Sequence, residues 1–563
     1  MTLLFYGPGG DDDTHISYTV ALHLAETGNI VNHSGEAVEQ GSSLLHVVSL
    51  AAAFKVINTL WSSLKLTDIG PLFSLFAAFL CLPIMLSLAK RCQIRSRHYL
   101  LSLLLLSVSF SYWAIGGLES TLTSLCLLCL ALTVTDGFSR RNSNALLAYC
   151  PIFMSCILVI TVRPEGYFII IAFLLALQVL ILLQKASEVQ DKSFCLKIFC
   201  FSTVVFVALC LWRDNYFMQW FPQPVYAKAE GISLDKIAFG FLYFIYSMQL
   251  SIIIYTLMLL SLLILIFFKA QQFEFTVLVI ISLSCSYLAF IVASGGDWMT
   301  GGRFFTPVIP LLILLCLKLL ESFSIKPIFW GLLLLLAAFE TLFFGLNFST
   351  GENILLDEKE GFRGQKTDFN RSMISHGDRY SWSEKHNILH LRDMATTNAL
   401  IDIVSAMQAD DHYKNKRINI SSIQMGMIPY HLSRTFSSSV RLIDLRGLSS
   451  LEVTSCAFFD DSARNWLGVK ASYPKYFAAI ESGDCPQLQW PDIIYDLSNL
   501  APRDRDLRLK AITSKGYRIV YQQQGFLQNA VANKSFDAAM FIAVSEQAYT
   551  LLPLHLRDKR LQF

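Results

Sequence analysis

The sequence predicts a polytopic α-helical membrane protein that carries a C-terminal mixed α/β domain outside the membrane. Of its 563 residues, 54% are hydrophobic and only 16% are charged, whereas soluble globular chains carry about 25% charged residues. The charges are also unevenly distributed: 38 of the 88 lie in residues 1–347 and 50 lie in residues 348–563. Such a change in composition indicates a membrane part followed by a water-exposed part.

Ten apolar runs are candidate membrane spans, because about 20 helical residues cross a hydrocarbon layer of about 30 Å. They lie near residues 69–89, 99–115, 118–135, 145–162, 167–183, 195–212, 250–268, 275–293, 304–320 and 327–347. A further run at residues 43–61 has polar residues at helical spacing, such as Lys55 and Asn58. We therefore expect it to lie on the membrane surface as a juxtamembrane helix.

Basic residues set the orientation, because short cytoplasmic loops are rich in Lys and Arg. Four of them crowd residues 90–97, and Arg140 and Arg141 lie in the loop two spans later. With these loops in the cytoplasm, the alternate loops and the C-terminal domain face outward. No apolar segment precedes residue 14 that could carry the N-terminus across, so we expect a first span upstream of Met1.

We expect three parts: residues 1–68 as an outer loop with an acidic motif and the juxtamembrane helix, residues 69–347 as the transmembrane domain, and residues 348–563 as an α/β domain on the outer side of the membrane. In the last part, residues 387–407 have the pattern of an amphipathic helix. Short apolar runs predict strands at 418–423, 440–445, 492–497, 517–522 and 538–544. Cys456 and Cys485 could form a disulfide in this compartment, although their spacing leaves the pairing open.

The first outer segment opens with an acidic run, Asp11-Asp12-Asp13. Two neighbouring carboxylates in one cavity repel each other, which raises the pKa of one and makes it a proton acceptor near neutral pH. The alternative is a solvated acidic turn that caps the following short helix, which we expect to end at Gly28.

The order of these motifs resembles that of the GT-C membrane glycosyltransferases from residue 10 to about residue 310. The nearest resemblance is to the mycobacterial terminal arabinofuranosyltransferases and to related lipopolysaccharide-synthesis proteins of Gram-negative bacteria. The segments that carry it are the Asp pair, Asn32 to Ser43 with its Gly-Glu-x-x-Glu-Gly-Ser pattern, Gly116 to Glu119, Arg163 to Gly166, Pro222 to Lys228 and Gly295 to Phe305, with weaker likeness at 426–430 and 444–448. His15 departs from the family's aromatic residue, and Ser43-Leu44 replaces its Asn-Pro.

The resemblance implies that a sugar moves from a polyprenyl-phosphate donor to a cell-envelope glycan or lipopolysaccharide acceptor at the periplasmic face of the inner membrane. Asp12 or Asp13 would be the general base. The cations Arg303, Lys228 and Arg163 are expected to bind the donor phosphate, unless they contact lipid headgroups. The acids expected to bind the substrate, unless they only pair with basic neighbours, are Glu36, Glu39, Glu119, Glu165 and Asp297.

No cofactor is identified, and a divalent cation stays an open alternative because carboxylate oxygens can hold one. His15, His33 and His46 match no zinc spacing, so we interpret them as polar loop residues. A net charge of +2 gives no reason to expect nucleic acid. Other functions stay open: a lipid-linked sugar flippase or transporter, which would need polar groups at mid-membrane depth, an O-antigen ligase that uses a pyrophosphate-linked chain, and a non-catalytic envelope assembly protein.

Overall fold

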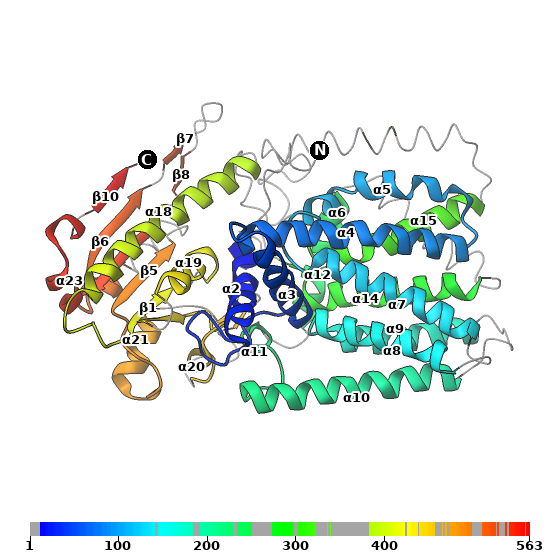
Figure 1. Cartoon of the computed structure of the whole chain (residues 1–563), viewed down its shortest axis with the longest axis horizontal. Coiled ribbons are helices and arrows are strands. Elements are labelled where there is room, and N and C mark those ends of the chain that lie inside the picture. The colour runs from blue at the N-terminus through cyan, green and yellow to red at the C-terminus, as the bar shows by residue number, and fades with distance from the viewer. Residues whose placement is uncertain are drawn as a thin grey trace. The chain divides into compact units, whose positions relative to one another are not determined.

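The computed structural model describes residues 12–140, 145–183, 192–228, 233–249, 273–297, 302–322, 335, 338, 382–422, 425–436, 439–456, 464–465, 468–469, 473–497, 509–524, 526–528, 535–537, 540–557 and 559–562. They fall into two compact units (Figure 1). Unit 1 holds the described residues within Ser43–Asn215 and Gly231–Phe348, and unit 2 holds those within Asp11–Ser42, Tyr216–Glu230 and Ser349–Phe563. Unit 2 thus joins the acidic N-terminal segment to the C-terminal residues.

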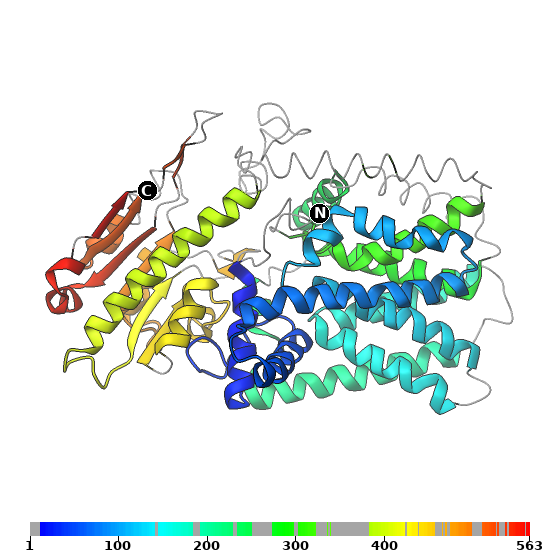
Figure 2. The same ribbon diagram turned by 45° about the horizontal axis from the view of Figure 1, so that its top comes forward.

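Unit 1 is helical. Its elements are α3 (Leu44–Leu60), α4 (Leu66–Arg91), η1 (Arg95–Tyr99), α5 (Leu100–Leu106), α6 (Val108–Trp113), α7 (Ser120–Arg140), α8 (Ala145–Val162), α9 (Gly166–Leu183), α10 (Lys192–Phe217, whose last residues belong to unit 2), α12 (Leu234–Gln249), α14 (Phe275–Ser294), η3 (Thr306–Val308) and α15 (Ile309–Ser322). Helix α7 packs against α4, α8 and α14, and α14 also packs against α9 and α12 (Figure 2). The long apolar helices therefore lie side by side.

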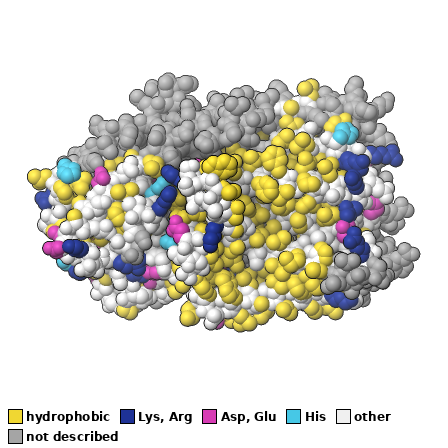
Figure 3. All heavy atoms as spheres, in the orientation of Figure 1, with side chains coloured by type: hydrophobic (Ala, Val, Ile, Leu, Met, Phe, Trp, Pro, Cys, Tyr) yellow, Lys and Arg dark blue, Asp and Glu magenta, His cyan; other side chains and the backbone are white. Residues whose placement is uncertain are grey.

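Four of the described helices are long and apolar enough to cross a membrane, namely α4, α7, α10 and α14. Hydrophobic side chains cover much of unit 1 on the face drawn in Figure 3. The exposed hydrophobic residues of unit 1 include Phe76 and Phe168. Large apolar surfaces of this kind are typical of contact with lipid. The exposed side chains of Lys90, Arg95 and Arg97 lie where α4 ends, as expected for residues in a basic loop at a membrane surface.

The predicted run at 99–115 is wrong as a single span. The chain leaves the helix at Ser107, whose backbone is extended (φ −73°, ψ 107°), and this residue separates α5 from α6. The run at 304–320 begins with the 3₁₀ turn η3 before α15. Helix α12 was not among the predicted spans. The runs at 250–268 and, apart from two residues, 327–347 lie outside the described residues. Helix α3 matches the predicted run at 43–61, and its place at a membrane surface stays a prediction.

Unit 2 is built on a six-stranded mixed sheet in the order β10-β6-β9-β5-β1-β2. The strands are β1 (Ile418–Ser422), β2 (Val440–Asp444), β5 (Ile493–Leu497), β6 (Tyr517–Gln524), β9 (Met540–Ser545) and β10 (Lys559–Gln562). Strands β2, β1 and β5 are parallel, β9 is antiparallel to β5 and β6, and β10 is parallel to β6. Two short ribbons, β3–β4 (464–465 with 468–469) and β7–β8 (526–528 with 535–537), lie outside this sheet.

Both faces of the sheet are covered, because successive side chains of a strand point to opposite faces. Leu442 and Ile542 belong to one core and their neighbours Ile443 and Ala543 to a second. Helix α18 (Trp382–Gln408) lies across the first face (Figures 1 and 2). The other described helices of unit 2 are α2 (Asp12–Thr27), α11 (Gln223–Lys228), α19 (Met427–Phe436), α20 (Leu451–Thr454), α21 (Tyr473–Ser482) and α23 (Glu546–Leu551), with the 3₁₀ turn η6 (Leu554–Leu556).

All five predicted strands are present, as β1, β2, β5, β6 and β9, and the predicted amphipathic helix is α18. Cys456 and Cys485, whose Cα atoms lie 5.7 Å apart, are joined as a disulfide. The chain is therefore a mostly helical protein with a small mixed sheet in its C-terminal region.

Candidate functional site

Five of the predicted site residues come together in unit 1. They lie in the turn before α7, in the turn between α8 and α9, and after α14: Glu119, Arg163, Glu165, Asp297 and Arg303. Arg163 donates from Nη1 to Glu119 Oε1 and from Nε to Glu165 Oε1, each at 2.6 Å. Arg303 binds Asp297 through Nε (2.5 Å) and Nη2 (3.1 Å). We call these five residues the arginine cluster.

The ring of Phe304 connects the two halves of the arginine cluster. The guanidinium carbons of Arg163 and Arg303 lie 4.7 Å and 5.2 Å from the centre of this ring, within the range of a cation–π contact. The N–H of Phe304 donates to the hydroxyl of Tyr243 on α12 at 3.1 Å. Helix α12 therefore helps to fix the turn that carries Arg303.

Glycines allow the close backbone approaches on which this arrangement depends. Gly166 begins α9, and a Cβ atom there would overlap the carbonyl oxygen of Val159 on α8. Gly296 has φ +78°, and a Cβ atom there would overlap the ring of Tyr243. Gly166 lets α9 approach α8 closely, and Gly296 lets the turn after α14 approach α12. These two approaches bring Arg163 and Asp297 into the cluster.

The arginine cluster is buried, since the side chains of its members are between 4% and 16% exposed. Burial raises the pKa of the Glu119 carboxyl, but the charges of Arg163 and Arg303 outweigh burial and hold this pKa below its usual range. Burial lowers the pKa of Arg163, and the carboxylates of Glu165 and Glu119 outweigh that effect and raise it. Glu119 and Arg163 therefore stay charged at neutral pH.

Two further polar side chains near the cluster were not among the site residues predicted from the sequence. The hydroxyl of Tyr287 on α14 and both ring nitrogens of His46 on α3 are buried and have no hydrogen-bond partner among the described residues. Tyr287 interacts electrostatically with Arg163, and His46 does so with Glu119. Buried polar groups are usually hydrogen-bonded. Burial without a described partner is therefore the structural signal that distinguishes these two side chains.

The acidic pair lies in unit 2, in the first turn of α2. A carboxylate in this position is stabilised by the partial positive charge of the helix N-terminus. Asp13 is half-buried, and the side chain of Asp12 lies outside the described part of the chain. The helix ends as expected at Gly28 (φ +77°), whose N–H donates to Leu24 O at 3.0 Å, but it already contains Asp12 and Asp13, which were expected to precede it.

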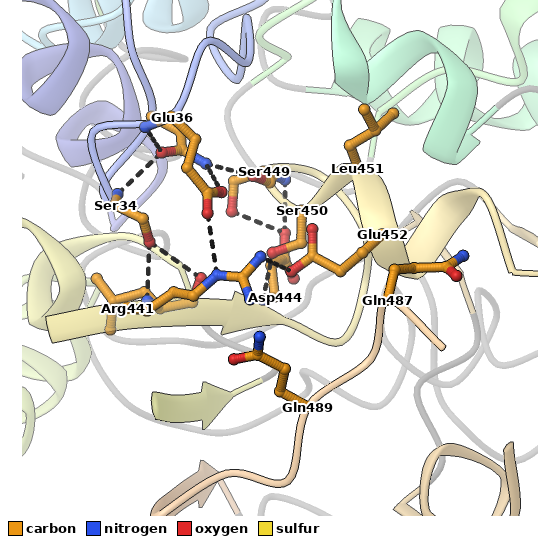
Figure 4. A network of polar contacts seen from close by, with 12 residues as sticks. Ser34, Glu36, Arg441, Asp444, Ser449, Ser450, Leu451, Glu452, Gln487 and Gln489 are labelled. Atoms are coloured by element: carbon orange, nitrogen blue, oxygen red, sulfur yellow. Dashed lines mark hydrogen bonds and ion pairs between the residues drawn. The ribbon is translucent and has the colours of Figure 1, made fainter. Parts of the chain in front are cut away.

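The loop that follows α2 is bound to the end of strand β2 (Figure 4). Arg441 donates to Glu36 Oε1 at 2.9 Å and to Glu452 Oε1 at 3.2 Å. Asn32 donates to Ser449 O at 2.9 Å. The predicted motif at residues 32–43 therefore meets, in unit 2, residues on both sides of the predicted motif at 444–448.

The segment 222–228 joins the same region. The backbone N–H of Gln223 donates to the carbonyl of the buried Glu39 at 3.0 Å. Its side chain donates to Gly447 O (2.8 Å) and Thr454 Oγ1 (2.7 Å). Lys228, the last residue of α11, is half-buried. Residues 426–430 pack on α2, where the rings of Tyr430 and His15 lie 5.5 Å apart.

The structure thus divides the predicted residues into two sets. Unit 1 holds Glu119, Arg163, Glu165, Asp297 and Arg303, and unit 2 holds Asp12, Asp13, Glu36, Glu39 and Lys228. The description of His15 and His46 as loop residues is wrong, because they belong to α2 and α3. His33 lies in a turn as predicted, and all three side chains are buried. Among the residues that the structure describes, no group of three His, Cys, Asp or Glu residues could hold a metal ion.

No protein-family model and no curated protein matches the chain. Among solved structures, it is similar to ArnT from Cupriavidus metallidurans bound to undecaprenyl phosphate. The two chains are 11% identical, the TM-score is 0.55, and the likeness covers 96% of this chain and 95% of that chain. A likeness at this identity shows the fold, and the chain therefore has the fold of a GT-C membrane glycosyltransferase.

Proposed function

We propose that the protein transfers a sugar from a polyprenyl-phosphate donor to a cell-envelope glycan or lipopolysaccharide acceptor, at the periplasmic face of the inner membrane. The observation that carries the proposal is the arginine cluster, in which charged residues of three separate turns are gathered and buried. A GT-C fold like that of a protein solved with undecaprenyl phosphate supports the same donor class.

The proposed reaction is a single displacement. Asp12 or Asp13 accepts the proton of the acceptor hydroxyl while the oxygen attacks the anomeric carbon. The bond to the lipid phosphate breaks, and the phosphate leaves as an anion, so that no general acid is needed. Arg303, Arg163 and Lys228 are proposed to stabilise its charge.

A guanidinium carries five N–H groups, and Arg163 donates from two of its nitrogens to Glu119 and Glu165. The carboxylates hold the guanidinium planes in fixed orientations, which suits bidentate binding of a phosphate. Glu39, Glu119, Glu165 and Asp297 are proposed to accept hydrogen bonds from sugar hydroxyls, and a divalent cation at these oxygens stays an alternative.

Binding of undecaprenyl phosphate to the purified full chain tests the donor class. Arg303→Gln removes a cation from the proposed site, and we expect it to weaken binding at least about tenfold, since hydrogen bonds to charged groups contribute about 1.5–3 kcal/mol. The matched control is Arg91→Gln, because Arg91 makes a similar two-bond pair with Asp136 (2.5 and 2.7 Å) at the end of α4. Equal affinities in all three proteins would overturn the assignment.

Glycan analysis of a deletion strain tests the reaction and names the sugar. If the protein is a transferase, the deletion strain lacks one sugar residue of the envelope glycan. The missing sugar and its position identify both donor and acceptor. Unchanged envelope glycans would favour a non-catalytic assembly role.

A further inference from the structure

The loop after α2 covers the open edge of the sheet in unit 2. Strand β2 ends the strand order, so one of its sides has no neighbouring strand in the six-stranded sheet. Ser34 Oγ accepts from the N–H of Leu442 at 2.8 Å and donates to the carbonyl of the same residue at 3.3 Å. The loop therefore satisfies backbone groups of an edge strand, which would otherwise offer them to another chain.

The loop is also held by hydrogen bonds between charged groups, which are stronger than these neutral hydrogen bonds. The side chain of Arg441 is 17% exposed and lies between the carboxylates of Glu36 and Glu452, which are 29% and 10% exposed (Figure 4). Burial raises the pKa of Glu452, the charge of Arg441 opposes this, and Glu36 adds to it. Arg441 therefore places one positive charge between two neighbouring carboxylates in a poorly solvated place.

Glu36 is engaged on both of its oxygens. Oε1 accepts from Arg441, and Oε2 accepts from Asn32 Nδ2 at 3.2 Å. Asn32 in turn accepts the N–H groups of Ser34 and Glu36 at 2.9 Å each. These bonds give the loop its shape, so Glu36 belongs to the support of the loop rather than to sugar binding. We call Asn32, Ser34, Glu36, Arg441 and Glu452 the Arg441 clamp.

Gln40 connects the Arg441 clamp to the helix of the acidic pair. Its Oε1 accepts from His33 N at 3.3 Å, next to Ser34, and its Nε2 donates to the carbonyl of Ile16 at 3.2 Å. Ile16 lies one turn beyond Asp12 in α2. A shift of the loop on β2 is therefore passed to the first turn of α2.

We infer that Arg441 is a positioning residue, which holds the first turn of α2, and with it Asp12 and Asp13, through Glu36 and the loop 32–40. This inference rests on the proposed function for its catalytic consequence. The C-terminal sheet thereby has a role in the placement of the general base, and Glu36 and Arg441 act together in this role.

Hydrogen–deuterium exchange on the full chain in detergent measures the clamp directly. Glu36→Ala leaves Arg441 and Glu452 as a balanced pair and removes only the attachment of the loop. We expect amides of residues 12–20 and 30–42 to exchange about tenfold faster, because a hydrogen bond to a charged group is lost. Glu36→Gln keeps an acceptor for Arg441 and should restore slow exchange in part. The control is Glu546→Ala, which breaks the exposed pair with Arg518 (2.8 Å) in the same unit.

Two functional readouts separate positioning from a general loss of structure. In the Glu36→Ala protein, undecaprenyl phosphate binding should stay at the wild-type value while sugar incorporation into the envelope glycan of complemented cells falls at least tenfold. The inference is overturned if exchange at residues 12–42 equals that of Glu546→Ala, or if faster exchange leaves sugar incorporation at the wild-type level. Failure of the proposed function is recognised separately, because then wild-type and deletion cells have the same glycans.

Discussion

Arg163 is held between two buried carboxylates, and this determines what its loss would cost. Arg163→Ala leaves Glu119 and Glu165 without their shared cation, and breaking a buried ion pair costs about 3–5 kcal/mol. Arg91→Ala should cost about 1 kcal/mol or less, because the Arg91–Asp136 side chains are about one-third exposed. Thermal unfolding in detergent measures both, and equal losses would show that the arginine cluster is no more buried than the loop at the end of α4.

His33 predicts how stability depends on pH. Burial lowers the pKa of this imidazole from 6.5 to about 3, so the folded protein keeps the ring neutral while the unfolded chain protonates it below pH 6.5. The unfolded state then binds more protons, and stability falls as the pH is lowered from 6.5 towards 3. At pH 5 the loss from His33 should be about 2 kcal/mol.

The variant His33→Leu tests this dependence. It should reduce the slope of the free energy of unfolding between pH 6.5 and pH 5. The control His412→Leu changes an exposed histidine of the same unit and should leave the slope as it is. A slope that is the same in all three proteins would contradict the burial of His33.

At the scale of elements, Gly166 sets the distance between α8 and α9. Gly166→Ala places a methyl group against the carbonyl of Val159, and such overpacking costs about 1–3 kcal/mol or more. It should also weaken undecaprenyl phosphate binding, because Arg163 and Glu165 lie in the same turn. Gly483→Ala is the control: its φ is +75° but a Cβ atom meets nothing within 4 Å, so we expect about 1 kcal/mol and unchanged binding.

Short apolar runs made the strands of unit 2 predictable, whereas the long apolar runs of unit 1 gave no sign of where one helix ends and the next begins. Strands β1, β2, β5, β6 and β9 follow from short apolar runs. The run at 99–115 is apolar on both sides of Ser107, so hydropathy carries no sign of the break between α5 and α6. Strand β10 has a polar sequence (Lys559–Gln562), and among the described strands it pairs with β6 alone, at the edge of the sheet. It therefore lacks the apolar pattern that indicates a central strand.

At the scale of the whole molecule, the residue types of the candidate site were predictable and their grouping was not. The sequence indicated Arg163, Asp297 and Arg303 as members of one face, but the pairing of each cation with its carboxylates needs coordinates. Arg441 was not singled out, since its partner Glu36 is 405 positions away. Contacts across such a separation depend on how the chain folds back, and no local pattern records them.

The orientation of the chain in the membrane is a prediction about the whole molecule. In a background without the exposed Cys150 and Cys200, Glu26→Cys should react with a membrane-impermeant thiol reagent added to spheroplasts, because α2 is expected outside. Arg97→Cys should react only after the membrane is permeabilised, since basic loops stay in the cytoplasm. Labelling of Arg97→Cys from outside would reverse the orientation and separate the acidic pair from a periplasmic acceptor.

The central claim is that the acidic pair supplies the base for sugar transfer, and the variant Asp12→Asn/Asp13→Asn tests it most directly. The measurement is sugar incorporation into the envelope glycan of complemented cells, beside undecaprenyl phosphate binding by the purified protein. We predict that incorporation falls by about 100- to 10,000-fold, the usual contribution of a general base, while binding is unchanged. Incorporation at the wild-type level would contradict the account.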